Sequence, residues 1–160
     1  MRSMCFSVPL ALAILAAFAH PAEAGFEEGV KAIQGNDMAT AEKELQVLAR
    51  ERDPRAQYLL GLYVYGSAES KLFDLNKAAP LLLDAAERGY TPAMIPLAGA
   101  YAEGKGVPKS FYESYKWVAI AERWNVANAS QLIEHVMREL KPDEIAKAKA
   151  AAASYSFKTK

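Results

Sequence analysis

Residues 93–121 read "AMIPLAGAYAEGKGVPKSFYESYKWVAIA", and this stretch decides the fold. Two segments with the helical spacing of apolar residues flank the loop "GKGVP", residues 104–108. Gly104 and Gly106 allow a sharp turn, because a positive φ costs little only for glycine. A phosphate-binding P-loop would need Gly-x4-Gly-Lys-Ser/Thr after a strand, whereas these glycines are two positions apart and follow a helix. The stretch therefore predicts two antiparallel helices joined by a tight turn.

The same pattern occurs again upstream, which identifies an internal repeat. The first helices match at a distance of 37 positions and the second helices at 36, and we assign the difference to a longer loop, residues 66–74, in the upstream copy. A third, degenerate copy contains Ala41, Leu45 and Leu48. The matched pairs are Ala56 with Ala93, Leu60 with Leu97, Gly61 with Ala98, Ala78 with Ser114, Leu82 with Val118, Ala85 with Ala121, and Gly89 with Asn125.

The apolar spacing and the helix-end signals predict an all-α chain. Asp53-Pro54 and Ser110 are typical helix starts, and Gly89 is a typical helix end. A helix pair exposes an apolar face that only a neighbouring pair can cover, so we expect a right-handed α-solenoid of antiparallel helix pairs. The expected helices lie near residues 26–34, 38–51, 54–65, 75–88, 92–103, 111–124, 128–140 and 142–155.

These residues resemble the Sel-one-like repeats (SLR) of secreted bacterial proteins, a family related to the tetratricopeptide repeats. Ala98 and Ser110 depart mildly from the family pattern, which prefers glycine and aspartate there. The positions that carry the resemblance are Leu60, Gly61, Ala78, Ala85, Gly89, Leu97, Tyr101, Gly104, Gly106, Trp117 and Ala121. The resemblance implies an SLR domain over residues 25–160, with a degenerate first repeat at 26–55, repeats at 56–92 and 93–128, and C-terminal capping helices at 129–157.

The N-terminal segment has the three-part layout of a secretory signal peptide. Arg2 precedes an apolar run at residues 8–19, and Ala22-Glu23-Ala24 supplies small residues at a cleavage point. We therefore predict a signal peptide over residues 1–24, cut after Ala24, and a periplasmic or secreted mature chain. The alternative is an uncleaved anchor. The only cysteine, Cys5, lies in this segment, so the mature chain forms no disulfide.

The composition argues against several kinds of chemistry. Lys plus Arg and Asp plus Glu both number 19, which gives no basic footprint for nucleic acid. After cleavage one histidine remains, His135, and we interpret it as an ordinary helix residue because no serine–carboxylate set accompanies it. One histidine without cysteine does not favour a metal site. We predict no catalytic residue, no metal, no cofactor and no membrane span in the mature chain.

The resemblance implies a non-enzymatic adaptor or scaffold of the bacterial cell envelope that binds a protein or peptide. In tetratricopeptide-like stacks the first helix of each pair lines the concave face. Tyr63, Tyr101 and Trp117 fit interior positions by their spacing. Two alternatives stay open, an envelope hydrolase and a regulatory subunit of an envelope enzyme, as do the partner and the oligomeric state. The candidate contacts on the concave face are Gln57, Tyr58, Tyr65, Met94 and Glu103.

The turn predicts the effect of a substitution. Gly106→Val places a β-branched side chain where we expect a positive φ, so the free energy of unfolding should fall by about 2 kcal/mol or more. Urea unfolding followed by circular dichroism measures this change. An unchanged midpoint would contradict the assignment of Gly106 to the turn.

Overall fold

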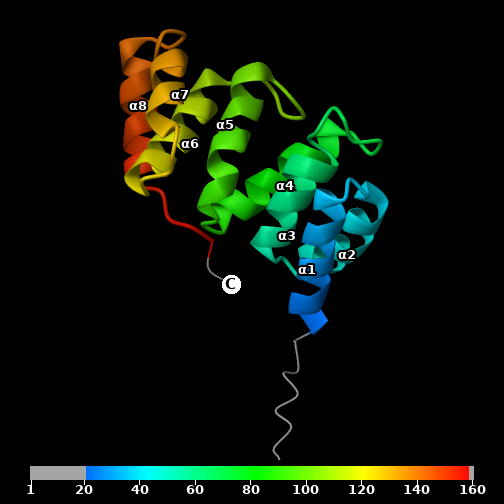
Figure 1. Ribbon diagram of the computed structural model, residues 1–160. Coiled ribbons are helices and arrows are strands. Elements are labelled where there is room, and N and C mark those ends of the chain that lie inside the picture. Colours follow the sequence, from blue (N-terminus) through cyan, green and yellow to red (C-terminus); the bar gives the residue numbers. More distant parts are fainter. Residues whose placement is uncertain (1–20, 159–160) are drawn as a thin grey trace, which may run out of the picture.

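The computed structural model describes residues 21–158 and contains only helices and connecting loops in that range (Figure 1). A π-helical turn, η1 (Leu60–Val64), continues α3, and a 3-10 turn, η2 (Thr91–Ala93), precedes α5. All eight predicted helices are confirmed. Residues 1–20 of the predicted signal peptide lie outside the described residues. The helices are α1 (Pro21–Gln34), α2 (Met38–Arg50), α3 (Pro54–Leu59), α4 (Leu75–Glu87), α5 (Met94–Glu103), α6 (Phe111–Arg123), α7 (Ala129–Met137) and α8 (Pro142–Ala153).

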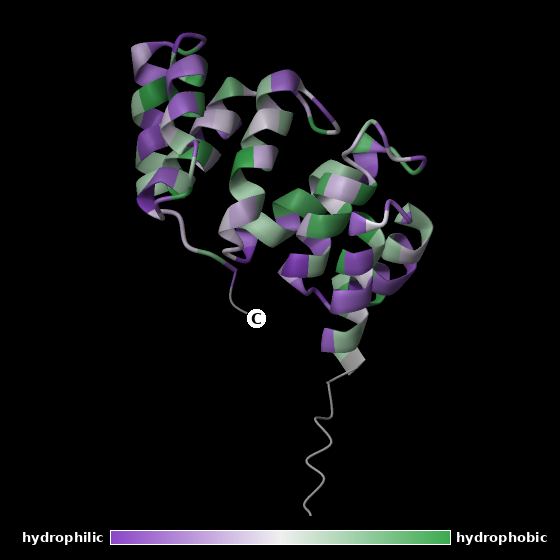
Figure 2. Cartoon of the chain, viewed as in Figure 1, coloured by the Kyte–Doolittle hydropathy of each residue, from purple (hydrophilic) through white to green (hydrophobic). Residues whose placement is uncertain are grey.

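The helix pairs follow one another along a curved row, from α1 and α2 at one end to α7 and α8 at the other (Figure 1). Apolar residues gather between the helices and polar residues cover much of the outer surface (Figure 2). One buried cluster joins α1 to α4 and a second joins α4 to α8. Each pair therefore buries its apolar face against its neighbours, and the chain is an all-α solenoid.

The internal repeat is visible as shared burial. Both members of the pairs Ala56/Ala93, Leu60/Leu97 and Ala85/Ala121 are buried. Ala41, Leu45 and Leu48 of the degenerate copy are buried as well. Small residues occupy the tightest contacts, since an added Cβ on Gly61 would lie 2.9 Å from Leu82 Cγ. The repeat positions thus set how closely neighbouring helices approach.

Three equivalent helix ends share a left-handed backbone. Gly89 has φ 82°, and its counterparts Arg52 and Asn125 have φ 65° and 53°. A positive φ at this point reverses the chain and lets the next helix fold back antiparallel. The sequence predicted such a helix end only at Gly89, because glycine is the typical residue at this position. The stack therefore imposes the same turn on arginine and asparagine.

The structure corrects the prediction about the extra residue of the upstream repeat. The amide of Tyr65 donates to the carbonyl of Leu60 at 2.9 Å, which is the i to i+5 bond of the π turn. The loops themselves are equal in length: Asp74 N donates to Tyr65 O at 2.9 Å, and Ser110 N donates to Tyr101 O at 2.8 Å. The extra residue is therefore absorbed in the helix as η1, and the loop at residues 66–74 is not longer.

Gly104 and Gly106 adopt the positive φ that the sequence predicted, at 74° and 71°. Gly106 also makes the closest contact between the two repeats. An added Cβ there would lie 1.9 Å from the carbonyl oxygen of Leu75 and 3.1 Å from the Cβ of Ala79, both in α4. No side chain fits in this space. The turn of the downstream repeat can therefore pack against α4 only if residue 106 is glycine.

Gly99 provides a control of opposite sign. It lies inside α5, and no atom lies within 4 Å of an added Cβ. Gly99→Ala should therefore raise the free energy of unfolding by about 0.5–1 kcal/mol, because alanine lowers the entropy cost of forming the helix. Urea unfolding of this variant beside Gly106→Val gives the comparison. A loss of stability in Gly99→Ala would contradict the open space at this position.

Candidate functional site

Three tyrosines of the repeat at residues 56–92 form an aromatic cluster. The rings of Tyr58 and Tyr63 meet edge to face with centroids 6.4 Å apart, and the rings of Tyr58 and Tyr90 lie 5.4 Å apart at 57°. Tyr63 is 41% exposed, whereas Tyr58 and Tyr90 are half-buried. Tyr58 comes from α3, Tyr63 from η1, and Tyr90 from the turn before η2. We call Tyr58, Tyr63 and Tyr90 the tyrosine cluster.

Tyr58 and Tyr90 of the cluster stay uncharged near neutral pH. Burial raises the pKa of Tyr58, and Tyr63 and Tyr90 raise it further. Burial also raises the pKa of Tyr90, against the opposing effect of Arg55. Neutral tyrosines present large ring faces together with hydroxyl groups that donate and accept hydrogen bonds. The cluster therefore offers a contact surface that is both apolar and polar.

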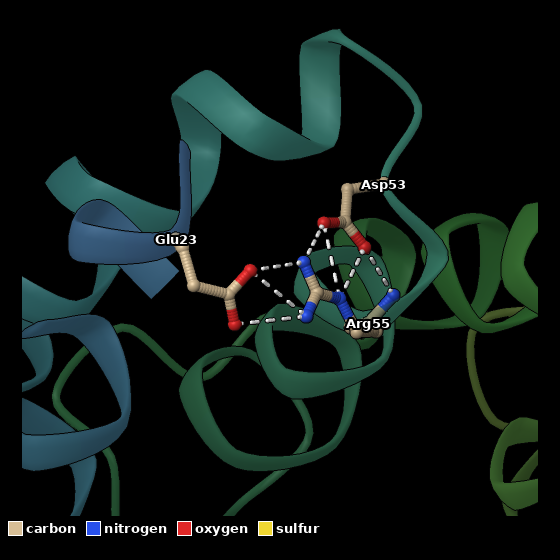
Figure 3. Close-up of polar contacts among 3 residues, drawn as sticks. All are labelled: Glu23, Asp53 and Arg55. Carbon is tan, nitrogen blue, oxygen red and sulfur yellow. Dashed lines mark hydrogen bonds and ion pairs between the residues drawn. The ribbon is translucent and has the colours of Figure 1, made fainter. Parts of the chain in front are cut away.

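Arg55 holds the neighbouring helix start in place. Its guanidinium donates to Asp53, with Nη2 2.8 Å from Oδ2, and its Nη1 lies 3.3 Å from Oε1 of Glu23 (Figure 3). It also lies 4.4 Å above the ring of Phe26. Glu23 precedes the predicted cleavage point after Ala24, so cleavage there would leave Asp53 as the carboxylate partner.

Three of the predicted contact residues are buried, and the prediction that they lie on an open surface is wrong. Gln57 and Tyr65 are 3% exposed and Met94 is fully buried. Gln57 and Met94 are equivalent residues of successive first helices, and both face the second helices rather than the outside. The spacing of apolar residues could not predict that Gln57 is buried. A polar residue within the apolar face of a helix has the pattern of a surface residue.

The sequence predicted Tyr63 in the interior and Tyr65 on the surface, and the structure shows the reverse. The π turn explains this difference. Its extra residue rotates the end of the helix, which turns Tyr63 outward and Tyr65 inward. The hydroxyl of Tyr65 donates to Oε1 of Glu42 at 2.5 Å and accepts from Nε2 of Gln46 at 3.0 Å. Burial, with the hydrogen bond to Glu42, raises the pKa of Tyr65 to about 12. Tyr65 therefore ties α2 to η1 and is not a surface contact.

Gln57 takes part in a second polar contact between helices. Its Nε2 donates to Oδ2 of Asp84 at 2.5 Å, and Arg88 Nε lies 3.3 Å from the same oxygen. Burial alone would raise the pKa of Asp84, but the hydrogen bonds from Gln57 and Arg88 outweigh it and lower the pKa below its ordinary value of 3.8. The ionised carboxylate thus links α3 to α4.

Two predicted contacts stay at the surface. Tyr58 is half-buried in the tyrosine cluster, and Glu103 is exposed and forms an ion pair with Lys105 at 2.5 Å. A groove of about 280 Å³ runs between the two repeats. Glu103 and Lys105 line one of its ends, and Leu62 of η1 lines it from the other repeat. Their role in binding stays a prediction.

The other residues that the sequence analysis named differ in their burial. Trp117 is buried and Tyr101 is half-buried, whereas Tyr63 is not the interior residue that its spacing predicted. His135 is exposed on α7. Over residues 21–158, no three His, Cys, Asp or Glu side chains gather where they could hold a metal ion. In the same range no helix has the length and apolarity needed to cross a membrane.

Comparison with known proteins identifies the fold. No family model and no curated protein sequence matches this chain. Among solved structures, the model superimposes on c5321, a protective antigen of uropathogenic Escherichia coli that displays an SLR fold, with a TM-score of 0.74 and 20% sequence identity. The match covers 82% of this chain and 29% of c5321. The chain therefore has the SLR fold that its sequence predicted, and it spans under a third of c5321.

The contact between Gln57 and Asp84 predicts a pH-dependent loss of stability. Asp84→Asn keeps an oxygen for Gln57 but removes the charge that faces Arg88, so the free energy of unfolding at neutral pH should fall by about 1 kcal/mol. Because the folded state lowers the pKa of Asp84, the stabilisation is present above pH 3.8 and is lost as the pH falls below it. Urea unfolding at neutral pH and near pH 2.5 should show the difference between wild type and variant shrinking in acid.

Asp143→Asn serves as the control. Asp143 forms an exposed ion pair with Lys147 at 3.4 Å, and exposed pairs contribute little. A difference between wild type and Asp84→Asn that persists at low pH would show that the charge of Asp84 is not what stabilises the contact.

Proposed function

We propose that this SLR-fold chain is a non-enzymatic adaptor of the bacterial cell envelope that binds a partner protein through the tyrosine cluster. The observation that carries the proposal is the contact of three tyrosines within the repeat at residues 56–92, with Tyr63 exposed among them. Helical repeat proteins of this kind typically act in protein–protein interaction. The envelope location is inferred from the signal-like residues 1–24.

The cluster has the properties of a binding hot spot. Tyrosine is enriched at such sites because it brings a large, rigid ring at a low cost in side-chain entropy. Tyr58 is held between two other rings, so much of its freedom is lost before binding. Leu62, the residue before Tyr63, lines the groove between the repeats, which could receive an apolar side chain of the partner.

The first helices contribute to both parts of this surface. The tyrosine cluster and the groove draw residues from α3, η1 and α5, the first helices of the two full repeats, and the groove is also lined by α4, a second helix. In solenoids the concave surface formed by successive repeats is the usual binding face. We therefore place the partner on the concave face. Tyr63 and Tyr90 replace the buried Gln57, Tyr65 and Met94 among the contact residues.

Removing the rings of Tyr58 and Tyr63 should weaken partner binding without unfolding the chain. The chain is purified from the envelope fraction, where its measured mass should be that of a chain that begins at Gly25. The partner is captured by crosslinking and identified by mass spectrometry. The affinity of this partner should fall at least 30-fold in Tyr58→Ala with Tyr63→Ala, because hot-spot tyrosines each contribute about 2 kcal/mol. Titration calorimetry measures the affinity.

Val47→Ala is the matched control, since Val47 is 55% exposed on α2, a second helix. It should bind like wild type. Because Tyr58 is half-buried, Tyr63→Ala is also tested alone, with circular dichroism as the check of folding. Equal affinity of wild type and a folded Tyr63→Ala variant would refute the assigned surface.

A further inference from the structure

The segment after α8 folds back onto the body of the solenoid. In Figure 1 it leaves the end of α8 and runs towards the lower end of α5. Tyr155 and Phe157 are half-buried, while Ser156 and Lys158 are exposed. This alternation with a period of two is that of an extended peptide that lays every second side chain on a surface. We call residues 155–158 the tail.

The tail contacts a defined surface at the end of α4 and along α6. The ring of Tyr155 lies 5.3 Å from that of Trp117, and the ring of Phe157 lies 5.6 Å from that of Trp124. Phe157 also lies flat on Gly89, with its Cγ 3.3 Å from where a Cβ would be. We call the surface formed by Glu87, Gly89, Trp117 and Trp124 the tail site.

Polar contacts set the direction and the register of the tail. The amide of Lys158 donates to the carbonyl of Glu87 at 2.7 Å, at the end of α4 where carbonyls lack helical partners. The ammonium of Lys158 pairs with the carboxylate of the same residue. The two aromatic residues and the base of the tail therefore bind two tryptophans and an acidic residue of the tail site.

The contacts that bind the tail are few, so another peptide can displace it. Within the described part of the chain, residues 156–158 form one backbone hydrogen bond, from Lys158 N to Glu87 O, and the Lys158 side chain of the ion pair is 56% exposed. Trp124 stays 56% exposed although Phe157 leans on it, so the tail covers its own site only in part. Segments with few buried contacts and exposed hydrogen bonds open at low free-energy cost.

We propose that the tail site is a second peptide-binding site, distinct from the tyrosine cluster, and that it recognises an extended partner segment of the form aromatic–x–aromatic–base. The chain's own tail occupies it in the absence of that partner. A tethered ligand acts at an effective concentration in the millimolar range, so the partner must bind the free site tightly to displace it. Extended segments that place alternate side chains in pockets are a common mode of peptide recognition.

The experiment uses the full chain and a labelled peptide with the sequence of residues 154–160, SYSFKTK. In the chain that carries Phe157→Ala and Lys158→Glu, the tail keeps only its Tyr155 contact and competes less, so fluorescence anisotropy should show the peptide binding at least 10-fold more tightly than to wild type. Lys149→Glu, an equal charge change at an exposed position of α8, should bind the peptide like wild type.

Intrinsic fluorescence reports on the same site, because the chain has two tryptophans and both contact the tail. Phe157→Ala should shift the emission of Trp124 towards that of a solvated indole, and the added peptide should reverse the shift. Lys158→Glu alone changes an exposed side chain and provides a variant that keeps the packing of Phe157, should the double variant fold poorly.

Charge reversal tests the specificity. Glu87→Lys, introduced into the Phe157→Ala chain so that Lys158 of the tail cannot pair with the new lysine, should bind SYSFKTK at least 10-fold more weakly than Phe157→Ala does and regain affinity for a peptide with glutamate in place of the lysine that matches Lys158. Equal binding of a peptide that has alanine at both aromatic positions would overturn the proposal. So would equal peptide affinity of wild type and both tail variants, or dimers formed by exchange of tails without binding of the peptide.

Discussion

Small residues at the contacts between helices set the spacing on which the rest of the structure depends. Ala56, Ala85, Ala93 and Ala121 are all fully buried, and each lies where two helices approach closely. At Gly106 the approach is closer still, because the backbone of the turn lies against the carbonyl of Leu75. A stack of helix pairs has no closed core of its own, so its stability depends on these neighbouring contacts.

The π turn at residues 60–64 is the main irregularity in this repeating pattern, and it has consequences for the surface. By taking up one extra residue, it places Tyr65 in the interior, where the hydroxyl bonds Glu42 and Gln46. The same rotation exposes Tyr63 beside Tyr58. A local change in helix geometry thus supplies both a polar tie between repeats and an aromatic group on the surface.

Polar contacts between helices reinforce a chain whose described residues contain no cysteine. Gln57 with Asp84, and Tyr65 with Glu42, each join helices that are distant in sequence. Both contacts are partly buried, and hydrogen bonds to a charged group contribute more than neutral ones. They also restrict the register in which the helices pack, because a buried polar group that loses its partner is costly.

The sequence by itself determined the helices, the repeat and the turn at Gly104 and Gly106, because apolar spacing, capping residues and glycine are local signals. It also placed Leu60, Leu97, Trp117 and Ala121 correctly in the interior. The location of the extra residue, and with it the exchange of Tyr63 and Tyr65, was decided by tertiary structure. The repeat spacing shows that the upstream copy has one extra residue, but local signals do not tell whether a loop or a π turn takes it up. The docking of Phe157 on Gly89 likewise joins residues that are far apart along the chain, and only the folded stack brings them together.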